Sequence, residues 1–169
     1  MKSYDYITLA LSLLAVLAAI YSAIQARSSN KKSEDALANS RNALSMQQSS
    51  LNLQEAALES QLNSSISSAV AGVQQAVTAL STKSPGDADY ALFKQHYKTA
   101  QEVWLNAYDQ ACLSYRESKL NQVTFQKAYE VQIRNIMNNS ELEDFFNPEA
   151  TSNYQSIIAV FRKWDTSRR

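Results

Sequence analysis

The residues best suited to chemistry in this sequence are its one histidine, His96, and its one cysteine, Cys112. Both fall in a run that predicts a single helix. They lie sixteen positions apart, so at about 100° per residue their side chains point roughly 160° apart. A Cys–His nucleophile pair within that helix is therefore disfavoured, and His96 has no second ligand at the helical spacing that a zinc site needs. We expect Cys112 to be a small buried residue beside Tyr108 and Tyr115.

Charged clusters offer a second kind of chemistry. Three carboxylates gather where a short helix is expected to begin, at Glu141, Glu143 and Asp144. Negative charge at a helix start is favourable without any catalytic role, so a structural role is predicted for them. Four basic residues near the C-terminus are candidates for contact with acidic lipid or a partner, a solvated helix end being the alternative: Arg162, Lys163, Arg168 and Arg169.

Composition and motifs exclude several further classes. Basic and acidic residues number 16 each, so the formal net charge is zero and no overall field favours nucleic acid. A single cysteine excludes an internal disulfide framework and fits a reducing compartment. There is no phosphate-binding loop, nucleophile elbow or zinc-protease motif. We predict a protein that is not an enzyme, with no catalytic residue, metal ligand or cofactor.

The fold class follows from the same composition. Only two glycines and two prolines occur in 169 residues, too few for the many tight turns of a β-sandwich. Apolar residues recur at three- and four-residue steps, whereas strand-like alternation is absent. The predicted class is all-α, with an N-terminal transmembrane helix, a long coiled-coil-like helix and a small C-terminal helical bundle.

An apolar run occupies residues 6–24, beginning with Tyr6 and ending with Ile24, and holds no charge, proline or glycine. A helix of this length extends roughly 28 Å, close to the thickness of a bilayer's hydrocarbon core. A helix also satisfies its own backbone hydrogen bonds within lipid. We predict a transmembrane anchor over residues 1–27 that contacts membrane lipid. A cleaved signal peptide and a buried core helix are the alternatives.

Flanking cations predict the orientation of this anchor. Arg27, Lys31 and Lys32 follow the apolar run, whereas Lys2 is the only basic side chain before it. Positively charged flanks tend to stay on the cytoplasmic side. We therefore expect a single-pass protein of the inner (plasma) membrane, with the C-terminal body in the cytoplasm.

Residues 28–83 predict a long, polar, coiled-coil-like helix. Leucines recur every seven residues in its first half, and its second half has alternating steps of three and four, the spacing that turns a stripe toward a partner helix. Self-association is predicted along a seam of Leu37, Leu44, Leu51, Leu58, Ile66, Val70, Val73, Val77 and Leu80. The alternative is a single amphipathic helix that packs back on the C-terminal domain.

A breaker containing Pro85 and Gly86 separates this rod from residues 84–169. Apolar stripes there predict helices over about 88–118 and 122–138. Together with the helices that follow, they predict a small bundle with its own core.

The end of the chain predicts two further helices. A capping box at Ser140 and Glu143 opens a short helix. Thr151 or Ser152 caps the last helix, on which Trp164 belongs to the apolar stripe and should be buried.

Three runs in residues 100–165, together with the apolar run, carry a resemblance. AYDQACLSY, FQKAYEVQIRNIM and NYQSIIAVFRKW resemble a pattern in small bacterial single-pass membrane proteins with a C-terminal helical domain, for which no reaction is known. The resemblance implies a bacterial source, a helical cytoplasmic domain, and a role in stress or phage defence.

The function predicted from these features is that of a membrane-anchored helical scaffold that binds itself and an unidentified protein. The alternatives are a periplasmic or secreted helical protein and a membrane-perturbing effector.

Overall fold

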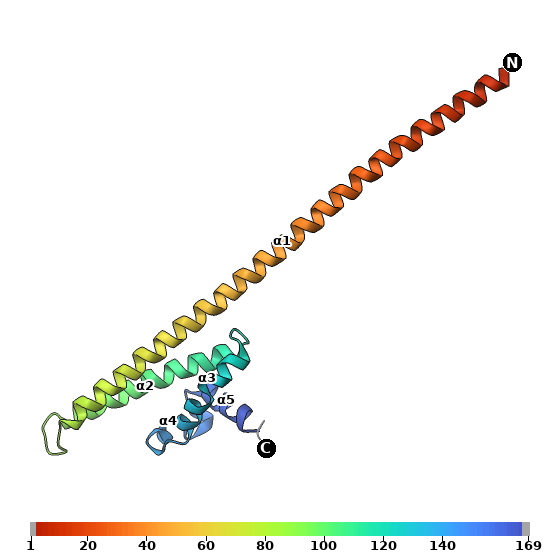
Figure 1. Ribbon diagram of the computed structural model, residues 1–169. Coiled ribbons are helices and arrows are strands. Elements are labelled where there is room, and N and C mark those ends of the chain that lie inside the picture. The colour runs from red at the N-terminus through yellow and green to blue at the C-terminus, as the bar shows by residue number, and fades with distance from the viewer. Residues whose placement is uncertain (1–2, 167–169) are drawn as a thin grey trace. The chain divides into compact units, whose positions relative to one another are not determined.

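The computed structural model describes the backbone of residues 3–166 and the side chains of residues 14–166. The described residues form helices and loops without any strand, which confirms the all-α prediction. There are five α-helices and two short 3₁₀ turns, and Figure 1 labels the α-helices. They are α1 (Ser3–Ser81), α2 (Tyr90–Arg116), α3 (Gln122–Met137), η1 (Ser140–Leu142), α4 (Glu143–Phe146), η2 (Glu149–Thr151) and α5 (Gln155–Thr166).

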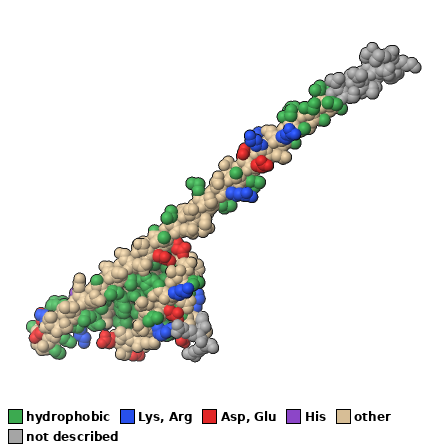
Figure 2. All heavy atoms as spheres, in the orientation of Figure 1, with side chains coloured by type: hydrophobic (Ala, Val, Ile, Leu, Met, Phe, Trp, Pro, Cys, Tyr) green, Lys and Arg blue, Asp and Glu red, His purple; other side chains and the backbone are tan. Residues whose placement is uncertain are grey.

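The chain divides into two compact units, Met1–Leu51 and Asn52–Arg169. The first unit contains only the N-terminal part of α1, and all of its described side chains, from Leu14 to Leu51, are exposed. Figure 2 shows hydrophobic side chains on its surface. A single helix has no second element against which to bury an apolar stripe, so the described part of this unit has no core.

The predicted anchor lies only partly within this description. Of the residues that the structure describes, no helical stretch is both long and apolar enough to cross a bilayer. The first part of the predicted span, residues 6–13, lies outside the residues whose side chains are described.

The second unit contains the rest of α1 together with all the other helices. Leu62, Ile66 and Ala69, spaced four and three residues apart on α1, are buried in one core with residues of α2, α3 and α5. Figure 1 shows this part of α1 beside α2. At these positions α1 packs on the C-terminal helices of its own chain. This arrangement was the alternative to a seam between two chains. The bundle begins near Asn52 and not at residue 84.

The predicted breaker forms the turn between α1 and α2. The Ser84 backbone N–H donates to the Asp87 carboxylate at 2.8 Å, and the Lys83 ammonium pairs with the Asp89 carboxylate at 2.5 Å. The first helix ends at Ser81, shortly before Pro85, as expected. The turn lies within the second unit and does not separate two units.

The centre of the core lies among α2, α3 and α5. Its largest fully buried side chains are Leu105, Cys112, Ile133, Ile136, Leu142, Ile157 and Val160. At one end Trp164 stacks edge-on against Tyr115, with ring centroids 5.4 Å apart, and its indole N–H donates to the Tyr115 hydroxyl at 3.0 Å. Trp164 is 4% exposed, which confirms its predicted burial.

One predicted helix cap is wrong, and another supplies only part of the cap that forms. The side chain of Asn139, not Ser140, caps the turn after α3 by accepting from the Glu141 N–H at 3.0 Å. At the start of α5 the carboxylate of Asp109 accepts from the N–H groups of Ser156 and Ile157, at 2.8 and 3.0 Å. The Ser152 hydroxyl accepts from the Tyr154 N–H at 3.1 Å, so Ser152 and a side chain on α2 both bond N–H groups at this helix start.

Candidate functional site

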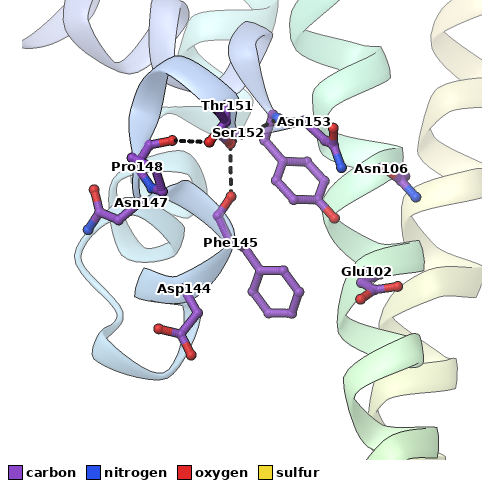
Figure 3. A pocket seen from close by; sticks show the side chains of 10 residues that line it. Glu102, Asn106, Asp144, Phe145, Asn147, Pro148, Thr151, Ser152 and Asn153 are labelled. Atoms are coloured by element: carbon purple, nitrogen blue, oxygen red, sulfur yellow. Dashed lines mark hydrogen bonds between the residues drawn. The ribbon is translucent and has the colours of Figure 1, made fainter.

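A polar pocket of about 350 Å³ lies in the second unit, between α2 and the segment that joins α4 to α5. Figure 3 shows Glu102 and Asn106, one helical turn apart on α2, across from Asp144, Phe145 and the loop of residues 147–153. The two walls are far apart in the sequence and meet only in the folded chain.

Local hydrogen bonds hold the loop wall in place. The Ser152 hydroxyl donates to the Phe145 carbonyl at 2.8 Å, and the Thr151 hydroxyl donates to the Pro148 carbonyl at 3.2 Å, as Figure 3 also shows. The Asn147 amide donates to the Glu143 carboxylate at 3.2 Å. The loop is therefore held by its own atoms, without the acidic groups that face the pocket.

The acidic groups of the pocket have no partner within the described residues. The carboxylates of Glu102 and Asp144 form neither an ion pair nor a hydrogen bond there. None of the ten lining residues is basic. The pocket is therefore a region of negative potential with acceptor atoms available.

Tyr154 also lines the pocket, and it is 5% exposed. No described residue forms a hydrogen bond with its hydroxyl, although its backbone N–H donates to Ser152. Burial is the main cause that raises the pKa of Tyr154, and the carboxylates of Glu102 and Asp109 raise it further. The phenol thus remains protonated as the pH rises past its ordinary pKa, and it keeps its capacity to donate and accept.

One cation lies near this pocket, on the neighbouring surface. The Lys98 ammonium is 5.7 Å from the centre of the Phe145 ring, and Lys98 lines an adjacent groove that shares Asp144 and Phe145 with the pocket. Glu149, on the connecting segment, pairs with Arg162. The pocket's two carboxylates therefore remain unpaired even with these neighbours counted.

The chain uses part of the predicted self-association seam for its own packing. Ile66 is buried in the core, and Leu58 and Val70 pack against it. Val73 and Leu80 are half-buried, whereas Val77 is exposed. The three remaining members, in the first unit, are at least half exposed: Leu37, Leu44 and Leu51. Ile66 is therefore corrected from a seam residue to a core residue, because its apolar neighbours belong to the same chain.

The basic residues near the C-terminus have partners where the structure describes them. Arg162 forms its ion pair with Glu149, and the Lys163 ammonium lies 4.8 Å from the centre of the Tyr115 ring. Arg168 and Arg169 lie outside the described residues. Contact of this cluster with lipid or a partner stays a prediction.

The two residues considered for chemistry lie apart. Cys112 is fully buried in the core, as expected, and burial raises the pKa of its thiol, with Asp109 adding to this and Arg116 opposing it. His96 is exposed in a shallow groove opposite Ser68 and Gly72 of α1. No three His, Cys, Asp or Glu side chains of the described residues are placed to hold a metal ion.

Of the residues that line the pocket, Asp144, Thr151 and Ser152 were named from the sequence, each with a structural role. Glu102 and Asn106 form a polar pair four residues apart on α2, a spacing that places two side chains on one helix face. This spacing could have pointed to a polar site on α2, but it is common on any solvated helix. Tyr154, just before α5, is buried and also lines the pocket.

Comparison of the chain with protein-family models, with curated proteins and with solved structures finds no match. The resemblance of residues 100–165 to small bacterial membrane proteins stays a prediction.

Proposed function

We propose that this protein is a membrane-anchored helical scaffold, with residues 6–24 in the bilayer and the second unit as its interacting body. The observation that carries the proposal is the exposure of apolar side chains on the first unit. Leu14, Val16, Leu17, Ile20, Tyr21 and Ile24 are each between 52% and 70% exposed. Apolar side chains gathered in this way are costly in water and mark a surface that another apolar phase covers.

Lipid is the occupant that fits this surface best. The exposed residues continue an uncharged run that begins at Tyr6. These large side chains lie on one half of the helix, and alanines and Ser22 occupy the other half, so no charged side chain interrupts the surface that lipid would cover. Arg27, Lys31 and Lys32 follow this run and favour a cytoplasmic position for the body at the inner (plasma) membrane. The resemblance noted above adds a bacterial stress or phage-defence setting to the proposal.

Self-association is the second part of the proposal. Leu37, Leu44 and Leu51 lie seven residues apart and are exposed. In a coiled coil, leucines at this spacing face the partner helix and bury one another. A second copy of the same helix would supply the matching stripe, so the anchored chains would pair just beyond the membrane.

The anchor can be tested by alkaline carbonate extraction of membranes from cells that express the full chain. We expect the protein to remain in the membrane pellet. Leu17→Arg combined with Ile20→Arg should release it, because each arginine near the centre of a span costs about 2.5–3.5 kcal/mol on the insertion scale.

A matched control is available farther along the same helix. Met46 and Leu53 are 73% and 71% exposed and lie outside both the apolar run and the leucine spacing. Met46→Arg combined with Leu53→Arg adds the same charge and should leave the protein in the pellet. Release of the wild-type protein by carbonate would contradict the anchor.

A further inference from the structure

In the second unit, α1 packs on the rest of its chain through one narrow face. We call this face the docking stripe, and its buried apolar side chains are Leu62, Ile66, Ala69 and Ala76. Steps of four, three and seven residues place them on one side of the helix. Two of the four are alanines, whereas the buried side chains of α2 include Leu105 and Tyr108. The part of α1 in this unit therefore buries less apolar surface than α2 does.

Cavities border the docking stripe on both sides. One of about 390 Å³ lies between α1 and α2, where it is lined by Gly72, His96 and Val103. A Cβ atom added at Gly72 would meet no atom within 4 Å. Another, of about 80 Å³, lies between α1 and α3 at Leu62 and Phe125. Closely packed interiors have few such gaps, so α1 is held less tightly than the core helices, and loosely held elements open at low free energy.

The same segment of α1 carries a second apolar stripe, the seam stripe of Val70, Val73, Val77 and Leu80. Its steps of three, four and three residues are those of a coiled-coil seam. Docking covers the seam stripe incompletely, because Val77 is 45% exposed and Val73 and Leu80 are only half-buried. The same residues of a second, parallel helix would bury all four side chains between the two chains.

The two modes of packing compete for the same residues. Val73 and Leu80 of the seam stripe also lie four residues after Ala69 and Ala76 of the docking stripe, so they face the bundle as well. While the bundle covers one side of these residues, a second helix cannot enclose them.

We infer that α1 changes partners between residues 62 and 80. It docks on the bundle of its own chain, or it pairs through residues 70–80 with the same residues of a second chain. Docking is thus an autoinhibitory contact that limits the coiled coil to the first unit. This inference rests on the self-association part of the proposed function, since anchored chains present these helices parallel to each other.

The test is disulfide crosslinking of the full chain in isolated membranes. Val73→Cys places a thiol in the seam stripe, and Leu44→Cys places one in the seam proposed for the first unit. Cys112 is fully buried, so the parent chain should give no crosslinked dimer. We expect Leu44→Cys to crosslink readily and Val73→Cys to crosslink slowly, because its own bundle shields each docked segment.

Two adjacent residues provide a matched pair of substitutions in the Val73→Cys chain. Ala76 is 1% exposed in the docked form, whereas Val77 is exposed. Ala76→Glu should raise the crosslinking rate about threefold or more, because docking would remove water from its carboxylate. Val77→Glu leaves docking intact and places carboxylates in the seam, so it should lower the rate. The double variant should crosslink no faster than the Val73→Cys chain.

Tyr129→Phe weakens docking without a buried charge. The Tyr129 hydroxyl on α3 donates to the Asn63 side chain on α1, and phenylalanine keeps the ring that packs on Phe125. This variant should raise crosslinking through Val73→Cys by about two- to tenfold. Near-ultraviolet circular dichroism of the aromatic core checks the folding of each purified variant, and Tyr129→Phe decides the test if Ala76→Glu unfolds the bundle.

Three results would overturn the inference. These are no crosslinking through Val73→Cys in any variant, equal effects of Ala76→Glu and Val77→Glu, and a double variant that crosslinks as fast as Ala76→Glu alone. Crosslinking through Leu44→Cys judges the self-association part of the proposed function separately. Its presence without any crosslinking through Val73→Cys would retain that part and reject the change of partner, and absence of both would reject both.

Discussion

At the scale of single residues, Trp164 shows how one side chain joins helices that are far apart in the sequence. Its ring contacts Tyr115 of α2 and Phe125 of α3, with centroid distances of 5.4 and 6.2 Å. Its indole N–H donates to the Tyr115 hydroxyl. A residue of α5 thus packs against α2 and α3 at once.

Trp164→Ala should destabilise residues 52–169 by about 3–5 kcal/mol, because it leaves a cavity within a packed core. Trp164→Phe keeps an aromatic ring and loses the N–H donor, so a smaller loss of about 1–2 kcal/mol is expected. Urea unfolding of the three proteins, followed by circular dichroism, measures both values. An unchanged midpoint for Trp164→Ala would show that the side chain is not part of the core.

Burial of Cys112 makes the stability of the fold depend on pH. Burial raises the pKa of its thiol above the ordinary value of 9.0. Below pH 9 the folded and unfolded chains both hold the proton, so the stability contributed by the thiol is fully present. Above pH 9 the unfolded chain loses this proton while the folded chain keeps it. Stability should therefore fall as the pH rises, by up to about 1.4 kcal/mol per pH unit from this group.

Cys112→Ala removes this dependence and should reduce the loss of stability between pH 9 and pH 10 by about 1 kcal/mol, because the unfolded thiol is only half ionised at pH 9. The comparison uses urea unfolding at pH 7, 9 and 10. The pH 7 value isolates the packing cost of the substitution, since the thiol is protonated in both states there. An identical pH slope in the two proteins would contradict the assignment.

At the scale of elements, α1 passes from one environment to another along its length. Its residues 62–69 bury an apolar stripe in the core of the second unit. In the first unit the leucines of the seven-residue repeat remain exposed. One apolar stripe of this helix therefore packs within its own chain. For the other stripe we propose that the same helix of a second chain is the partner.

We expect residues 28–169, which lack the apolar run, to form a dimer or higher oligomer at micromolar concentration. Leu44→Asp combined with Leu51→Asp should return the mass to that of one chain, because a carboxylate in the seam loses water without gaining a partner. The measurement is light scattering, with circular dichroism to check that the bundle stays folded.

The matched control for this seam is Met46→Asp with Leu53→Asp. These residues have the same spacing and similar exposure, on a different face of the helix. That variant should keep the oligomeric mass. A wild-type fragment that is highly helical and monomeric would contradict the intermolecular coil and leave the anchor as the proposed site of self-association.

At the scale of the whole molecule, orientation in the membrane decides which compartment the pocket faces. Arg27, Lys31 and Lys32 predict that Arg169 lies in the cytoplasm. Alkaline phosphatase fused after Arg169 should then be inactive, and a fluorescent protein at the same position should be bright. Active phosphatase with a dark fluorescent fusion would instead support the periplasmic or secreted alternative.

The local features of this protein follow from the sequence alone. The three- and four-residue spacing of apolar residues predicted α2, α3 and α5 to within a few residues, because helix periodicity depends on neighbours in the chain. The burial of Cys112 and Trp164 followed from their places in those stripes. Secondary structure and the direction of each apolar face were therefore determined before any long-range contact.

Only the tertiary structure decided what each face meets. An apolar stripe specifies that something covers it, and a helix of the same chain satisfies Ile66 as well as a second copy would. The Asp109 cap and the pocket of Glu102, Asp144 and Tyr154 depend on segments more than forty residues apart. No local pattern records such a pairing, because side chains distant in the sequence come together only when the whole core has packed.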